Sequence, residues 1–216
     1  MRARSFDVIV DLRQTALGLF LPCRFRTPVL PQTFTGHMRQ KHLQRLKTVY
    51  PDFMMPDHPQ AIIPKPVAAF VDVPGHVAIA AGAADCAKRW GPQGFVEIAD
   101  HLSAQGQRVV FVGDHNDVPI VEEIRQNMRH PSVSLAGQAD LRELAFVLQQ
   151  ARFVITHDSA ALHLAGYFSA PVIALWGPTD AGKYGPWSPR SVVVHRGRQM
   201  SSIKVEDVVN AIAQMP

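Results

Sequence analysis

Four groups of small or polar residues directly follow apolar runs in the sequence. They are residues 82–88, 113–117, 157–159 and 177–180. Open parallel sheets bind ligands just outside the carboxyl ends of their strands, so these groups are the natural places for chemistry. The strongest candidate is residues 156–163, Thr-His-Asp-Ser-Ala-Ala-Leu-His, where a strand leads into a helix. Backbone N–H groups at the start of a helix form a site for an anion such as phosphate.

The side chains around this helix start suit a phosphate. Asp158 or Ser159 is placed as the cap, and Ala160 is small enough to let an anion approach. His163 shares a helical face with Ser159, and helical side chains lean toward the N-terminus. Lys88, in the loop after the first apolar run, could meet a diphosphate. Each residue also has an ordinary interpretation, as a simple cap, a core histidine or a solvated lysine.

The other loops carry weaker signals. Asp114 and Asp117 flank an asparagine, a pattern for which Asx-type turns are the usual explanation. Thr179 and Asp180 belong to a Gly-Pro-Thr-Asp segment that could be a plain turn. The sequence contains no G-x-S-x-G elbow, no G-K-[ST] phosphate loop, no G-x-G-x-x-G, no D-x-D pair and no credible metal-ligand spacing. A diphosphate leaving group would therefore be stabilised by backbone N–H groups and lysine rather than by a metal.

The elements that must position these loops alternate along the chain. Continuous apolar runs predict strands buried on both faces at 77–81, 109–113, 153–156 and 172–176, with shorter strands at 132–135 and 191–195. Apolar residues at helical spacing predict helices around 95–102, 118–128, 141–148 and 205–212. Asp140 followed by Glu143 predicts a capping box at the third of these helices. Repeated strand–helix alternation predicts an α/β fold with a Rossmann-like, doubly wound parallel sheet.

The first 65 residues have a different pattern. They predict one strand at 6–12 and helices at 15–21 and 37–49, the second of them rather polar, before a proline-rich connector. One strand cannot form a sheet. This segment either adds to the edge of the larger sheet or forms part of a second domain. We therefore predict a partial N-terminal domain over residues 1–65 and a complete C-terminal domain over residues 66–216.

Composition narrows the class of protein. The 216 residues are 47% hydrophobic and 19% charged, which is typical of globular proteins. No apolar stretch approaches the roughly 20 residues of a membrane helix. Two cysteines indicate a reducing cytoplasm rather than a disulfide scaffold. The net charge of +4 is not concentrated in a basic block with interleaved aromatics, so we expect no nucleic-acid partner.

Three stretches carry a resemblance to glycosyltransferase family 9, the lipopolysaccharide heptosyltransferases. Residues 157–165 resemble the family's D-[TS]-G-x-x-H-L-A segment. Residues 172–187, with Trp-Gly-Pro-Thr-Asp and a later Gly-Pro turn, resemble its F-G-P-T-D-P segment, and residues 80–90 resemble its G-A-x-x-x-x-K-x-W stretch. The resemblance covers about residues 66–200 and, more weakly, 6–12.

The resemblance implies the GT-B arrangement of two Rossmann-like domains around a cleft, with residues 1–65 in the acceptor-side domain and residues 66–216 forming the nucleotide-sugar-binding domain. It also implies inverting transfer of heptose from an ADP-sugar donor to the lipopolysaccharide core, without a cofactor or an essential metal. The implied location is the cytoplasm, and the acceptor leaves open peripheral membrane contact at the inner face of the inner membrane.

The family's binding roles carry over to matching residues. Lys88 would contact the donor diphosphate or sugar, and Asp158 would bind sugar hydroxyls. The backbone of Ser159 and Ala160 would hold phosphate, supported by His163. The remaining expected substrate-binding residues are Gly82, Thr179, Asp180 and the pair Asp114 and Asp117, of which one would meet the ribose.

The sequence departs from the family pattern in three places. Ala160 replaces a glycine where the donor approaches, and Ala181 replaces a proline. Nothing between Met1 and Pro66 matches the family's glycine-rich loop with its general-base aspartate, so no catalytic base is assigned. The alternatives are an inactive, truncated module that binds nucleotide sugar without transfer and, outside the family, an unrelated doubly wound nucleotide-binding protein.

Overall fold

The computed structural model of the chain describes residues 6–13, 15, 17–29, 33–54, 62–67 and 74–215. The chain divides into two compact units, Met1–Pro59 and Gln60–Pro216. The boundary predicted from the sequence, after residue 65, lies a few residues C-terminal to this division. Within the described part of the chain, no helix combines the length and apolar character needed to cross a membrane.

The larger unit is built on one sheet of six parallel strands, in the order β5-β4-β3-β6-β7-β8. The strands are β3 (Val77–Ala80), β4 (Val109–Phe111), β5 (Val133–Ser134), β6 (Phe153–His157), β7 (Val172–Trp176) and β8 (Ser191–His195). Each lies within a predicted run, except that β6 continues one residue further, to His157. The predicted doubly wound parallel sheet is confirmed.

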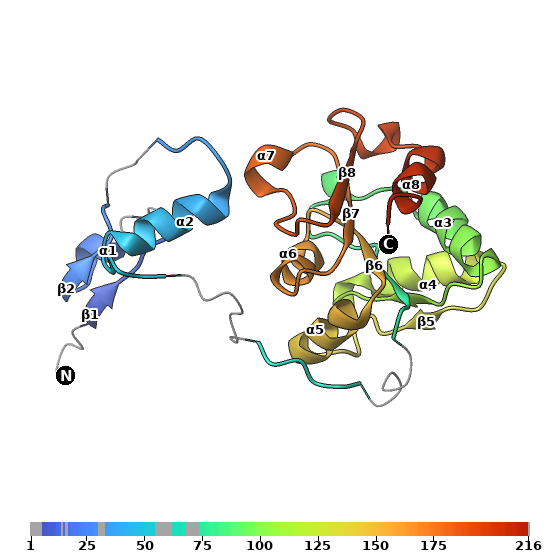
Figure 1. Ribbon diagram of the computed structural model, residues 1–216, viewed down its shortest axis with the longest axis horizontal. Helices are drawn as coiled ribbons and strands as arrows, with labels where there is room; N and C mark the ends of the chain where they lie inside the picture. The colour runs from blue at the N-terminus through green and yellow to red at the C-terminus, as the bar shows by residue number, and fades with distance from the viewer. Residues whose placement is uncertain are drawn as a thin grey trace. The chain divides into compact units, whose positions relative to one another are not determined.

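Helices cover both faces of this sheet. The longer ones are α3 (Pro92–Ala104), α4 (Val118–Asn127), α5 (Leu141–Gln150), α6 (Ala160–Tyr167) and α8 (Val205–Ile212). Helices α3, α4 and α8 pack on one face, and α5 and α6 pack on the other (Figure 1). In β3, Val77 and Ile79 face the first group while Ala78 and Ala80 face the second. Burial on both sides explains why the strands are continuously apolar.

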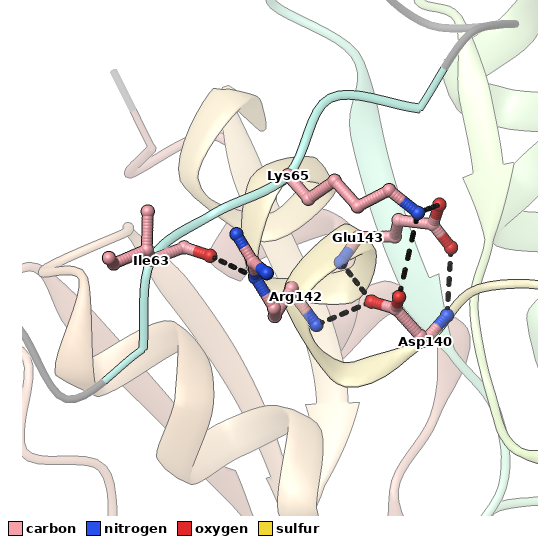
Figure 2. Close-up of polar contacts among 5 residues, drawn as sticks. All are labelled: Ile63, Lys65, Asp140, Arg142 and Glu143. Carbon is pink, nitrogen blue, oxygen red and sulfur yellow. Dashed lines mark hydrogen bonds and ion pairs between the residues drawn. The ribbon is translucent and has the colours of Figure 1, made fainter.

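Helix α5 begins with the predicted capping box. Asp140 Oδ1 accepts hydrogen bonds from the Arg142 and Glu143 amides, each at 2.8 Å, and Glu143 accepts from the Asp140 amide. The entry segment, residues 62–67, lies along this helix start (Figure 2). Lys65 Nζ pairs with Glu143 Oε1 at 2.7 Å, and Arg142 Nε donates to the Ile63 carbonyl at 2.9 Å. The residues that cap α5 therefore also anchor the chain where it enters the larger unit.

The smaller unit has a parallel sheet of its own. Its elements are β1 (Phe6–Ile9), α1 (Leu17–Phe20), β2 (Cys23–Arg26) and α2 (Met38–Lys47). The prediction of a single strand was wrong, because β2 alternates arginines with Cys and Phe and forms no apolar run. As far as the structure describes the chain, β1 and β2 pair only with each other, so this segment does not extend the larger sheet.

A buried arginine attaches α2 to the strands of the smaller unit. Arg45 is 2% exposed, and it donates from Nε to the Asp11 carbonyl at 3.0 Å and from Nη2 to the Pro28 carbonyl at 2.6 Å. Those carbonyls follow β1 and β2 respectively. Arg45 thus fastens the helix to the carboxyl ends of both strands of the smaller unit.

Candidate functional site

The larger sheet reverses its direction of winding between β3 and β6. From β3 the chain moves outward through β4 and β5, and from β6 it moves outward on the other side through β7 and β8. β3 and β6 are hydrogen-bonded neighbours, with Ala80 opposite Thr156. Open α/β sheets bind their ligands at such a switch point, outside the carboxyl ends of the strands. The loops after β3 and β6 are therefore adjacent at the position where a ligand is expected.

Lys88 and Asp158 form an ion pair at this switch point. Lys88 Nζ lies 2.6 Å from Asp158 Oδ2, and the two side chains are 24% and 11% exposed. Thr179, from the loop after β7, donates its hydroxyl to the same Oδ2 at 3.0 Å. His163 Nε2, on α6, lies 3.9 Å from Asp158 Oδ1. One carboxylate thus gathers side chains from two loops and a helix, and the lysine that it holds is still partly open to solvent.

Helix α6 begins beside this pair. Ser159 is its N-cap residue, one of the two that the sequence indicated, and Ala160 at the first helical position is exposed. The Ser159 side chain makes no capping hydrogen bond, and its hydroxyl lies 3.0 Å from Thr156 Oγ1. The cap side chain therefore leaves the first N–H groups of α6 to other acceptors, at the end where the helix dipole is positive. An anion fits this position.

His157 contacts both ends of the segment that carries Lys88. The Trp90 amide donates to His157 Nε2 at 2.9 Å, and His157 Nδ1 lies 3.4 Å from the Gly82 carbonyl. The ring is fully buried and meets Phe95 edge-on at 5.3 Å between centroids. Burial lowers the pKa of His157 to about 4, so the imidazole is neutral near pH 7.

From the sequence, His157 was predicted only as part of a polar loop, without a role of its own. The structure makes it the last residue of β6, in step with Phe153 and Ile155, which face α3. Because alternate residues of a strand point to the same face, this spacing could have predicted that the His157 ring lies on the α3 side of the sheet. The sequence did not reveal it, because both faces of β6 are apolar and the pattern does not distinguish one from the other.

Asp117 packs directly against Gly82. A side-chain carbon on Gly82 would fall inside the Asp117 carboxylate, and one on Gly113 would come within 2.7 Å of Asp117 Cβ. Asp117 Oδ2 accepts from the Asp114 amide at 3.0 Å, and Asp114 Oδ1 accepts from the Asn116 amide at 2.7 Å. Burial raises the pKa of Asp117, partly offset by the hydrogen bond from Asp114. Asp114 is exposed, and both carboxylates form the capping box of the short helix η3 (His115–Asp117).

Other features lie apart from this cluster. Asp180 is exposed and caps α7 (Ala181–Tyr184) by accepting from the Gly182 amide at 2.9 Å. A cavity of about 340 Å³ lies at the opposite, amino-terminal edge of the sheet, where it is lined by residues such as Gln107 and Arg152 and by the ends of α3 and α8. It contains none of the predicted binding residues. In the described ranges, no three His, Cys, Asp or Glu side chains are grouped so that they could hold a metal ion.

The part of the chain that contains this cluster matches a known protein family. The family model of glycosyltransferase family 9 (heptosyltransferase) matches residues 55–212. Lipooligosaccharide heptosyltransferase 2 of Haemophilus influenzae is 35% identical over 112 residues, which are 50% of this chain and 32% of that protein. Lipopolysaccharide heptosyltransferase 3 of Escherichia coli is 36% identical over 104 residues, 47% of this chain and 31% of that protein. The matched segments thus span about a third of each relative.

Solved structures share the fold. Escherichia coli heptosyltransferase WaaC with ADP has a TM-score of 0.74 at 16% identity, covering 98% of this chain and 73% of that one. A family 9 glycosyltransferase from Veillonella parvula has a TM-score of 0.73 at 20% identity, covering 88% and 62%. At these identities the likeness establishes the GT-B-type fold alone. Because the family model matches well over half of its residues, this chain belongs to glycosyltransferase family 9, the heptosyltransferase family.

Proposed function

We propose that the larger unit binds the donor of a glycosyl transfer, an ADP-linked sugar, at the switch point between β3 and β6. The observation that carries the proposal is the pairing of Lys88 with Asp158 beside the open start of α6. A cation and a row of backbone N–H groups together suit a diphosphate. Their partial exposure lets a ligand reach both.

The same groups have a role in transfer. When the bond between sugar and diphosphate breaks, negative charge grows on the departing diphosphate. Lys88 and the first amides of α6 are held in place before the reaction, so they stabilise this charge without having to reorganise, an effect worth several kcal/mol in enzymes. Inverting transfer would then need no metal. Asp158, oriented by Lys88 and Thr179, would direct its Oδ1 toward sugar hydroxyls.

The ribose contact is assigned to Asp117 rather than Asp114. The Asp117 carboxylate lies over Gly82, at the carboxyl end of β3 and next to the segment that carries Lys88. Each carboxylate accepts one hydrogen bond within the η3 turn, so the choice rests on the position of Asp117 over Gly82, whereas Asp114 is exposed. A comparison of Asp117→Asn with Asp114→Asn tests this choice, because only the first should weaken binding of ADP.

The names of the relatives support a choice of donor and acceptor. The curated relatives are named lipooligosaccharide or lipopolysaccharide heptosyltransferases, and WaaC was solved with ADP. We therefore propose ADP-heptose as the donor and the lipopolysaccharide core as the acceptor. The smaller unit is proposed as the acceptor side, with the acceptor at the inner face of the inner membrane.

The binding experiment is a calorimetric titration with ADP. Lys88→Ala should weaken binding about 10- to 100-fold, the value of one charge-assisted hydrogen bond of about 1.5–3 kcal/mol. Asp158→Ala should also weaken it, because Lys88 loses its anchor. Arg129→Ala is the matched control, since it removes one exposed cation beyond the C-terminal end of α4, at the opposite edge of the sheet. Unchanged affinity in both site variants would refute the proposed site.

A second measurement separates transferase from binding module. The chain is incubated with ADP-heptose and a lipopolysaccharide core acceptor, with and without a metal chelator, and heptose transfer is followed. Transfer that survives chelation supports the metal-independent enzyme. Binding of ADP-heptose without transfer favours the alternative module that holds the nucleotide sugar only.

A further inference from the structure

The segment that carries Lys88 has little internal structure to hold it. Between β3 and α3 its regular element is η2 (Cys86–Lys88), a short 3₁₀ helix whose first turn is capped by Asp85. Its internal hydrogen bonds run from the Lys88 amide to Asp85, from the Arg89 amide to Cys86, and from Arg89 Nε to the Ala83 carbonyl at 2.7 Å. A helix this short does not fix its own position. The placement of Lys88 therefore depends on how the two ends of the segment are held.

His157 holds both ends with one ring. Its Nε2 accepts from the Trp90 amide after the segment, and its Nδ1 faces the Gly82 carbonyl before it. An amide N–H only donates, so Nε2 carries the lone pair and the neutral ring carries its proton on Nδ1, where it is directed at the carbonyl. The Trp90 indole donates separately to the Ile203 carbonyl at 3.0 Å, which fastens the far end of the segment to the loop before α8.

The next residue along the chain completes the arrangement. Asp158 directly follows His157 and holds the Lys88 ammonium at 2.6 Å. The end of β6 therefore contacts the backbone of the Lys88 segment through His157 and the Lys88 side chain through Asp158. These two contacts are separate, because the His157 ring is buried toward α3 while the Asp158 carboxylate is at the partly open surface.

We propose that His157 is a positioning residue for Lys88, holding the 82–90 segment so that the Lys88 ammonium is aimed at the ligand bound beside α6. His157 does not touch that ligand. The inference rests on the proposed function, since the ligand of Lys88 is the diphosphate named there. Replacement by an apolar ring leaves a buried amide and a buried carbonyl without partners, which drives the segment to move.

A double-mutant cycle on ADP affinity tests this role. The four proteins are the wild type, Lys88→Ala, His157→Phe and the double variant. In the wild type, loss of Lys88 should cost about 10- to 100-fold in affinity. In the His157→Phe background the same change should lower the affinity less than about 3-fold, because a mispositioned lysine already contributes little to binding. His157→Gln, whose side-chain oxygen reaches the position of Nε2, should restore part of the dependence on Lys88.

The outcomes separate this inference from the proposed function. An equal loss from Lys88→Ala in both backgrounds overturns the positioning role and leaves the diphosphate site standing. No loss from Lys88→Ala in the wild type overturns the site itself, and the inference with it. The cycle is repeated with His157→Asn, which is smaller and keeps a donor for the Gly82 carbonyl, so that a folding failure of the phenylalanine variant does not decide the result.

Discussion

The burial of His157 predicts a specific loss of stability in acid. The ring is fully buried, it accepts a hydrogen bond from the Trp90 amide, and desolvation lowers its pKa from 6.5 to about 4, with the positive charge of Arg89 adding to the effect. Protonation would turn Nε2 into a donor facing another donor. We therefore compare the wild type with His157→Gln, which is neutral at every pH and keeps an acceptor for Trp90.

The size and sign of the effect follow from linkage. Above pH 6.5 the imidazole is neutral in the folded and unfolded chain, and its favourable contacts contribute fully. Between 6.5 and about 4 the unfolded chain binds a proton that the folded protein does not, so stability falls as the pH falls. The slope is about 1.4 kcal/mol per pH unit, which amounts to about 3 kcal/mol over this interval.

The assay is urea unfolding of both proteins at steps from about pH 7 to about pH 4. The advantage in unfolding free energy that the wild type holds over His157→Gln should shrink by about 3 kcal/mol across this range. Other groups that titrate here, such as the Asp117 carboxyl with its raised pKa, are present in both proteins and cancel in the difference. A gap that stays constant with pH would show that His157 is not buried as a neutral ring.

Three further predictions concern the framework of the larger unit. Gly82→Ala should lower the free energy of urea unfolding by about 1–3 kcal/mol, because the added Cβ would meet the Asp117 carboxylate. Gly91→Ala is the control and should lower it less, because nothing lies within 4 Å of its added Cβ. Equal losses would contradict the packing argument. Ser169→Gly should raise stability by about 0.5–1 kcal/mol, because Ser169 has φ 55° at the end of α6, and an unchanged or lower melting temperature would count against the strain. Lys65→Met should speed hydrogen exchange and proteolysis in the entry segment, because it removes the ion pairs with Asp140 and Glu143. High salt should have the same effect on the wild type. Equal rates in variant and wild type would show that these pairs do not hold the segment.

Much of the larger unit could be predicted from local sequence. Its strands are covered on both faces, so each one is a continuous apolar run, and its helices show an apolar stripe. The Asp140 and Glu143 box was readable because both partners lie within one helical turn. The smaller unit was harder, since β2 is a short strand with exposed arginines and its pairing with β1 is a contact between separate segments.

The candidate site was predictable only as a set of loops. Lys88, Asp158 and Thr179 were singled out because each follows a strand, and the structure brings them together. Asp180 was singled out on the same ground, yet its carboxylate caps α7. A position directly after a strand predicts that a residue lies at the rim of the sheet. The direction of its side chain depends on local turns and caps. The hydrogen bonds of His157 with Trp90 and Gly82 could not be predicted, because they join residues 67 and 75 positions apart in the sequence.

Composition and periodicity by themselves determined the fold class of the larger unit, its element boundaries to within a few residues, and the loops available for chemistry. Those properties depend on interactions within a few residues of each other. The tertiary structure alone decided that β6 lies beside β3, and hence that Asp158 meets Lys88, 70 residues away. Strand order is set by which pairings bury the most apolar surface across the whole sheet, a sum over distant residues that no single segment carries.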